Sequence, residues 1–208
     1  SYKKLDLINK SSIIKIMEAI KNIKTEKIFK TILIAVLGSI LLTISAKLKV
    51  NFSFWGLGNT VPMTMQTFVV LFLGIAFGYK IGLATVSLYL LEGILGLPVF
   101  ANSPEKGIGI VYFTGPTMGY LIGFLIAVFF AGYLQFEKLT ITNVIFIFFK
   151  LVFSVSFIYI LGLFWLSTLI GWDKAFKFGA QPFLLAELFK ILLLTTTFPW
   201  IIKIRKII

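Results

Sequence analysis

Long apolar stretches separated by short polar segments dominate the chain. A helix needs about 20 apolar residues to cross a bilayer, and six stretches approach or exceed that length. A turn at 78–80 separates the second stretch from the third. The pattern predicts an all-α integral membrane protein with six transmembrane helices, at 31–46, 63–77, 81–96, 111–134, 144–170 and 182–202.

Residues 1–30 carry a different pattern, in which isoleucines recur between lysines at helical spacing. This pattern is typical of an amphipathic helix that lies on the membrane surface. The segment lacks the apolar core of a cleavable signal peptide. We therefore expect a cytoplasmic amphipathic segment at 1–30 and a six-helix membrane domain at 31–208.

The composition agrees with a lipid environment. Of the 208 residues, 59% are hydrophobic and 13% are charged, whereas about a quarter of the residues are charged in soluble proteins. The mean hydropathy is +1.00. These values exclude a soluble enzyme. The net charge of +12 does not indicate a nucleic-acid partner, because the cations gather near the chain ends, beside membrane spans.

The lysines and arginines also predict the orientation. With six spans, thirteen cations fall on the side of the two termini and five on the opposite side. Because cytoplasmic loops carry the excess of positive charge, both termini are expected in the cytoplasm. The loops after the first, third and fifth spans would then face outward. The predicted location is the cytoplasmic (inner) membrane.

The sequence contains no His and no Cys. It therefore cannot form a Ser-His triad, an HExxH zinc site, a disulfide or a thiolate nucleophile. We expect no catalytic residue, no metal site and no cofactor, and we favour ligand binding or transport. The alternative is a membrane enzyme acting on a lipid or vitamin precursor, with Glu92 or Glu187 as its lone acid.

Three acidic or basic side chains lie near the outer ends of the predicted spans. An ionisable group within a span costs a few kcal/mol to insert, so each calls for a reason. Glu187 and Lys190 are spaced i, i+3 and share one face of the last span. They predict either a self-neutralising ion pair or the polar floor of a pocket that opens outward. Glu92, at a similar depth, would face this pocket or bond to a neighbouring helix.

Small side chains recur every four residues in the first span, at Ala35, Ser39 and Thr43. This spacing lets another helix approach closely. The stripe predicts either packing inside the same bundle or an interface with a partner protein. In the second case, a bulky residue at Ser39 is expected to block complex formation and to spare ligand binding.

Four strings of residues resemble the signatures of the BioY family, the biotin-specific S components of energy-coupling-factor (ECF) transporters. They occur in the family's order: TVPMTMQTFVVLFLGIAFGYKIG at 60–82, YLLEGILGLPVFAN at 89–102, FTGPTMGYLIGF at 113–124 and GLFWLSTLIGWDKAFKFGAQPFLLAELFK at 162–190. The resemblance implies an ECF S-component-like bundle with an outward-facing pocket that binds biotin.

The resemblance also implies partners, namely an ECF transmembrane coupling protein and two cytoplasmic ATPases. Because the sequence has no GxxxxGK[ST] phosphate loop, ATP would be hydrolysed only by those partners. A solitary carrier that moves biotin without the ATPases is the alternative, and the sequence does not distinguish the two.

Biotin suits the polar residues of the last span. Its ureido ring has two N–H donors and one carbonyl, so Glu187 would accept the N–H groups and Lys190 would donate to the carbonyl. The carboxylate of the tail would need a donor near the mouth, where Asn102 and Lys106 lie. The other residues that we expect at the ligand are Glu92, Gln66, Tyr120 and Tyr89.

The chain departs from the family's pattern in the last span. Glu187 stands where the family usually has Asp, and its carboxylate reaches one methylene further. Leu185 and Ala186 replace the usual Pro-Gly, which should make the start of this helix straighter. We expect these departures to affect the affinity for biotin and the ring system that the pocket prefers.

Overall fold

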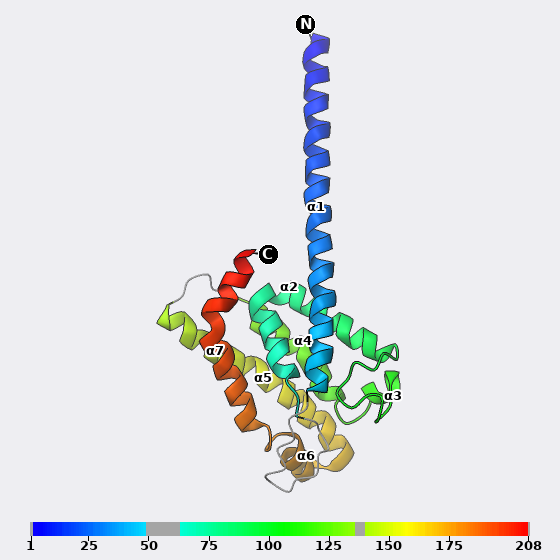
Figure 1. Ribbon diagram of the computed structural model, residues 1–208, viewed down its shortest axis with the longest axis vertical. Helices are drawn as coiled ribbons and strands as arrows, with labels where there is room; N and C mark the ends of the chain where they lie inside the picture. The colour runs from blue at the N-terminus through cyan, green and yellow to red at the C-terminus, as the bar shows by residue number, and fades with distance from the viewer. Residues whose placement is uncertain (1, 49–62, 136–139, 208) are drawn as a thin grey trace. The chain divides into compact units, whose positions relative to one another are not determined.

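The computed structural model describes residues 2–48, 63–135 and 140–207, and their side chains except at 2–20, 24, 206 and 207. These residues form helices and no β-strand. Figure 1 shows the helices, which are α1 (Tyr2–Lys47), α2 (Gln66–Ile94), α3 (Gly109–Phe113), α4 (Met118–Gly132), α5 (Ile141–Ile170), α6 (Trp172–Gly179) and α7 (Leu184–Ile207). Residues 49–62, between the first two predicted spans, lie outside the described residues.

Several of these helices suit a membrane. Four stretches are long and apolar enough to cross one: Lys21–Lys47, Gln66–Ile94, Ile141–Ile170 and Leu184–Arg205. The helix α4 is apolar but shorter. The prediction of an all-α protein with several helices long and apolar enough to cross a membrane is confirmed for the described residues, whereas the count of six spans stays a prediction.

The helix α2 is interrupted at Gly78, between the predicted second and third spans. Gly78 has φ 80° and ψ 169°, which is not helical. Because this φ is positive, a side chain there would be strained, and glycine is the residue that adopts it readily. The turn predicted at 78–80 therefore appears as a break within α2.

Two segments differ from the predicted pattern. A single span was expected at 111–134, but α3 ends at Phe113 and α4 begins at Met118. Pro116 lies between them, and proline restricts the residue before it and lacks the N–H that a helix interior needs. The predicted loop at 171–181 contains the helix α6, whose Ala175 and Gly179 are buried while both of its lysines are exposed.

The first helix runs without a break across residue 30, where a boundary between an interfacial segment and a span was expected. Residues Ser1–Ile34 and Ala35–Ile208 form separate compact units. The first unit consists of the N-terminal part of α1. The amphipathic pattern expected for its side chains falls mostly outside the described residues.

The small residues of α1 lie inside the second unit. Ala35 and Ser39 are buried, and the Ser39 hydroxyl donates a hydrogen bond to the carboxylate of Glu92 in α2. Thr43 is half-buried, and its hydroxyl donates to the backbone oxygen of Ser39. This geometry corresponds to packing within the bundle, the first of the two alternatives. An interface of these residues with a partner stays a prediction.

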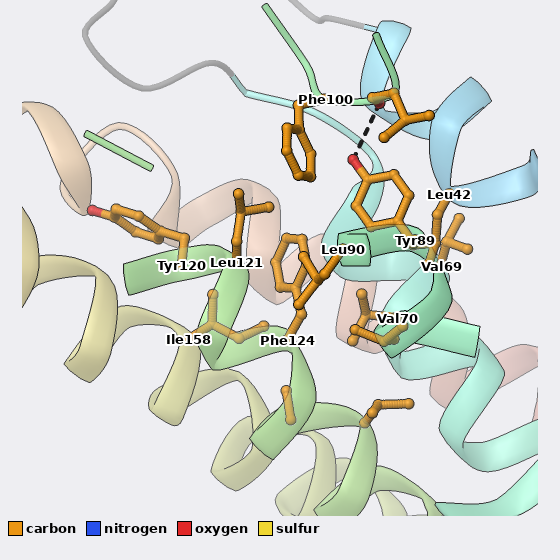
Figure 2. Close-up of a cluster of buried hydrophobic side chains, with 14 of the residues drawn as sticks. Leu42, Val69, Val70, Tyr89, Leu90, Phe100, Tyr120, Leu121, Phe124 and Ile158 are labelled. Carbon is orange, nitrogen blue, oxygen red and sulfur yellow. Dashed lines mark hydrogen bonds between the residues drawn. The ribbon is translucent and has the colours of Figure 1, made fainter. Parts of the chain in front are cut away.

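The helix α4 packs against both α2 and α5, and α7 packs against the same two helices. One apolar cluster joins α2, α4, α5 and the segment before α3, and its centre is formed by large side chains such as Tyr89, Phe100 and Phe124 (Figure 2). A second cluster joins α2, α5 and α7. The polar residues at the starts of α2 and α7 lie beside these clusters.

Close packing of α2 and α4 makes Gly132 sensitive to substitution. A Cβ atom on Gly132 would lie 2.3 Å from the backbone nitrogen of Tyr79, whereas one on Gly82 would lie 2.6 Å from a methyl group of Val128. Because backbone moves less easily than a methyl group, we expect Gly132→Ala to lower stability by about 1–3 kcal/mol and Gly82→Ala by less. Thermal unfolding in detergent measures both, and an equal loss in the two variants would contradict this packing.

Candidate ligand-binding site

A pocket lies among α4, α5 and the starts of α2 and α7. Each of these elements contributes side chains to its wall. The polar residues of the lining are Thr64, Gln66, Thr67, Thr117, Glu187 and Lys190. The aromatic residues are Phe100, Tyr112, Tyr120, Phe124, Tyr159 and Phe183. The pocket therefore combines a small charged group with a largely aromatic wall, as small-molecule sites commonly do.

The charged group is an ion pair within α7. The Nζ atom of Lys190 lies 2.8 Å from Oε1 of Glu187, and the two residues are 7% and 5% exposed. Their i, i+3 spacing brings them together on one face of the helix. Glu187 also lies in the first turn of α7, where the helix dipole stabilises a negative charge. Pairing offsets part of the cost of burying both charges.

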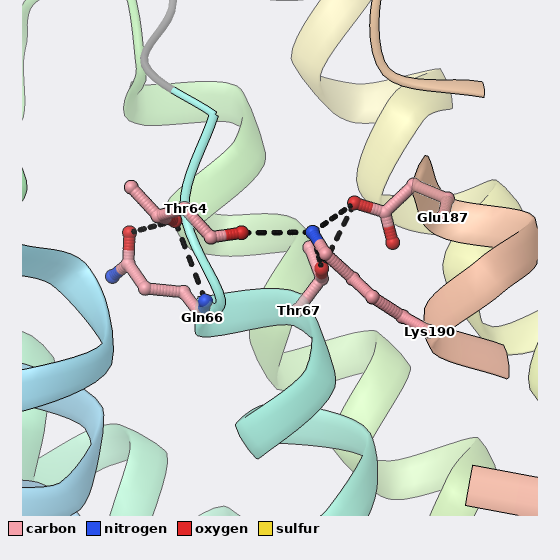
Figure 3. Close-up of polar contacts among 5 residues, drawn as sticks. All are labelled: Thr64, Gln66, Thr67, Glu187 and Lys190. Atoms are coloured by element: carbon pink, nitrogen blue, oxygen red, sulfur yellow. Dashed lines mark hydrogen bonds and ion pairs between the residues drawn. The ribbon is translucent and has the colours of Figure 1, made fainter. Parts of the chain in front are cut away.

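Two threonines at the start of α2 complete the contacts of Lys190 (Figure 3). Its Nζ donates to the backbone oxygen of Thr64 at 2.8 Å and to the Thr67 hydroxyl at 2.9 Å. The Thr67 hydroxyl in turn donates to Oε1 of Glu187 at 2.9 Å. An ammonium group has three N–H donors, so Thr64, Thr67 and Glu187 engage all of them. These contacts connect α7 to the start of α2.

The second oxygen of the Glu187 carboxylate is in a different position. Oε2 is buried and accepts no hydrogen bond of ordinary geometry from the described residues. The phenol of Tyr159 lies near enough to interact electrostatically with this carboxylate. A buried carboxylate oxygen without a donor costs free energy. Oε2 therefore has unused acceptor capacity in the wall of the pocket, beside the Tyr159 phenol.

A second set of contacts supports the aromatic wall. The Gln66 amide donates to the Tyr89 hydroxyl at 2.7 Å. That hydroxyl donates to the backbone oxygen of Val99 at 3.2 Å, the bond dashed in Figure 2. Next to Val99, the ring of Phe100 stacks on Tyr112 with centroids 5.1 Å apart. The ammonium group of Lys47, at the end of α1, donates to the backbone oxygen of Phe100 at 2.7 Å. These bonds fix the segment that carries Phe100 into the pocket wall.

The sequence matches the BioY family over residues 17–206, which is most of the chain. This chain belongs to the BioY family. Its relatives are transporters and not enzymes, so membership supports the binding or transport class expected from the sequence. The resemblance carried by the four strings at 60–82, 89–102, 113–124 and 162–190 is confirmed.

Two curated relatives illustrate the similarity of this BioY-family chain. It is 35% identical to the "Probable biotin transporter BioY" of Pyrococcus horikoshii over 130 residues, which cover 62% of this chain and 74% of that protein. It is 37% identical to the "Biotin transporter BioY" of Thermotoga maritima over 132 residues, which cover 63% and 75%.

The fold of the BioY-family chain is also similar to a solved one. The "S-component for biotin from an ECF-type ABC transporter" matches with a TM-score of 0.70 and 24% sequence identity, over 87% of this chain and 93% of that chain. At this level of identity the similarity describes the fold. It agrees with the S-component-like bundle expected above.

The structure brings four of the predicted site residues together in the pocket. These four residues, all part of its lining, are Gln66, Tyr120, Glu187 and Lys190. Tyr89 does not line the pocket. Its hydroxyl accepts a hydrogen bond from Gln66, which does.

Three other predicted residues lie elsewhere. The backbone nitrogen of Asn102 donates to the Tyr112 hydroxyl at 3.3 Å, so Asn102 is next to the wall without being part of it. Lys106 is exposed in the same loop. Glu92 accepts its hydrogen bond from Ser39 and does not line the pocket. A ligand contact stays a prediction for Asn102 and Lys106, whereas Glu92 makes the bond to a neighbouring helix that was its second expected role.

Sequence reasoning missed three residues that contact or adjoin the ion pair of Glu187 and Lys190. Thr64 and Thr67 hold Lys190, and Tyr159 lies beside Glu187. The two threonines carry a recognisable signal, because they flank Gln66 at the polar start of an otherwise apolar helix. Tyr159 carries none, since it is one of many aromatic residues in the apolar sequence of α5.

Proposed function

We propose that this chain is the biotin-binding subunit of a vitamin uptake transporter. The observation that carries the proposal is the buried acceptor Oε2 of Glu187, adjacent to the ammonium group of Lys190 within an aromatic pocket. The two curated relatives named above are both called biotin transporters. Their names and the chemistry of the pocket support the same ligand.

The ureido ring of biotin complements this pair of residues. Along each edge of a cyclic urea, an N–H donor stands beside the carbonyl acceptor. Oε1 of Glu187 already accepts bonds from Lys190 and Thr67, so we assign one urea N–H to Oε2. The urea oxygen would then accept from Lys190, in exchange for one of its present contacts. Hydrogen bonds of this kind, with one charged partner, are about twice as strong as neutral ones.

The remainder of biotin is apolar apart from its terminal carboxylate. The sulfur-containing ring and the aliphatic tail would lie against the aromatic wall, which includes Tyr120, Phe124 and Tyr159. Burial of apolar surface contributes about 25 cal/mol per Å². The tail would direct its carboxylate towards the loop that contains Asn102 and Lys106, whose side chains carry N–H donors.

For transport, we propose that the chain lies in the cytoplasmic (inner) membrane with six spans and with both termini in the cytoplasm. It would bind biotin from outside and deliver it together with an ECF coupling protein and two ATPases. The similarity of the fold to an ECF S component favours this mode over the solitary carrier. Biotin uptake by cells with and without the genes for such a module distinguishes the two modes.

Direct binding tests the proposal. We expect the detergent-solubilised protein to bind radiolabelled biotin saturably, with a dissociation constant below the micromolar range. Excess unlabelled biotin should displace the label, and a linear vitamin without a cyclic urea should not. Absence of saturable binding in that range would contradict the assigned ligand.

A further inference from the structure

The ring of Tyr120 fills a niche in the wall of the pocket. Tyr120 belongs to α4, lines the pocket and is 7% exposed. Its ring makes an edge-to-face contact with Tyr159, with centroids 6.0 Å apart. Tyr159 in turn lies beside Glu187. The position of the Tyr120 ring therefore determines how much room the pocket has beyond Tyr159.

Gly162 of α5 forms the first side of the niche. A Cβ atom on Gly162 would lie 2.4 Å from both Cδ1 and Cε1 of the Tyr120 ring. Side-chain carbons do not approach this closely, so even one methyl group at position 162 must displace the ring. The absence of a side chain at Gly162 is what lets the ring come this close to α5.

Gly179, at the end of α6, forms the second side. Its backbone oxygen accepts a hydrogen bond of 2.9 Å from the Tyr120 hydroxyl. A Cβ atom on Gly179 would lie 2.3 Å from that hydroxyl oxygen and 2.7 Å from Leu166. Both glycines thus hold Tyr120 away from the centre of the pocket, one through the space for its ring and the other through its hydroxyl.

We propose that Gly162 and Gly179, acting through Tyr120, set the width of the pocket and so select ligands by the size of their ring system. The inference rests on the proposed function. With the urea at Glu187, the ring fused to the urea lies next to Tyr159 and Tyr120. A methyl group at position 162 pushes the Tyr120 ring towards this fused ring, because the pocket is the open side of the niche.

Comparison of biotin with desthiobiotin, the analogue that lacks the sulfur-containing ring, tests the proposal. We expect Gly162→Ala to weaken biotin binding at least about tenfold more than desthiobiotin binding, a typical effect of one methyl group on pocket selectivity. The double variant Gly162→Ala/Tyr120→Leu should bring the ratio of the two affinities back towards that of the wild type, because the smaller side chain leaves room for the added methyl group.

Gly82→Ala is the matched control. Its added methyl group also meets a side chain, Val128, at 2.6 Å, but neither residue lines the pocket. This variant should keep the wild-type ratio of the two affinities. If Gly162→Ala left the ratio unchanged, or if the double variant recovered nothing, the selection by Tyr120 would be refuted. Wild-type protein that binds neither compound would instead refute the proposed function, and this inference with it.

A second variant covers the case in which Gly162→Ala does not fold. Tyr120→Leu widens the pocket, so it should bind biotin sulfone, which carries two additional oxygens on the sulfur-containing ring, better relative to biotin than the wild type does. We expect a change of about tenfold in this ratio. A ratio equal to that of the wild type would overturn the role of Tyr120.

Discussion

Replacing Glu187 by Gln is expected to weaken biotin binding about a hundredfold, or by about 3 kcal/mol. The substitution keeps the size of the side chain but removes its charge. The buried Lys190 then loses its anionic partner, which lies 2.8 Å away. An amide also offers one acceptor oxygen where the carboxylate offers two, so the bond to the urea competes with those to Lys190 and Thr67. Titration of the purified variant with radiolabelled biotin measures the loss.

Glu92→Gln provides the matched control for this prediction. It makes the same chemical change at another acid in an apolar helix, but Glu92 bonds to Ser39 and does not line the pocket. The amide oxygen of Gln can still accept the bond from Ser39. We therefore expect wild-type affinity. If Glu92→Gln reduced biotin binding and Glu187→Gln did not, the assignment of the ureido group to Glu187 would be wrong.

Lys190→Met is expected to lower the stability of the protein by about 3–5 kcal/mol. Methionine is similar in length to lysine, so the packing of α7 is largely kept. The Glu187 carboxylate, however, remains buried without a compensating cation, and the backbone oxygen of Thr64 loses the donor at 2.8 Å. Thermal unfolding in detergent, in the absence of biotin, measures the change.

The double variant Glu187→Gln/Lys190→Met distinguishes two causes of the stability loss, the unpaired buried charge and the lost hydrogen bonds. With both charges removed, it should be more stable than Lys190→Met alone, because no unpaired ion remains. Lys106→Met is the control for the loss of a lysine, since Lys106 is exposed, and it should not change stability. A double variant less stable than Lys190→Met would contradict the origin of the effect.

The parts of the fold and site that follow from periodicity could be predicted from the sequence. Apolar length predicts the membrane-crossing helices, and glycine at position 78 marks the interruption of α2. The spacing of Glu187 and Lys190 is sufficient to place both on one face of α7, where they form their ion pair. In each case the interaction is local, so the sequence separation alone defines the geometry.

Contacts between helices could not be predicted in the same way. The depth of Glu92 along its helix equals that expected for a ligand contact, but depth does not determine the direction of the side chain around the axis. Tyr89, one turn earlier, faces the apolar cluster and Gln66, whereas Glu92 faces Ser39. The role of Thr67 likewise depends on the approach of α2 to α7, between residues far apart in the sequence.

The bonds around Lys190 have a thermodynamic consequence for recognition. A free lysine side chain carries about 2 kcal/mol of rotamer entropy, and a receptor that immobilises such a side chain on association loses affinity accordingly. Here Thr64, Thr67 and Glu187 restrain the ammonium group through bonds made entirely within the chain. Folding alone orders this part of the receptor. The site is thus preorganised, so binding of a urea does not cost the rotamer entropy of a flexible lysine side chain.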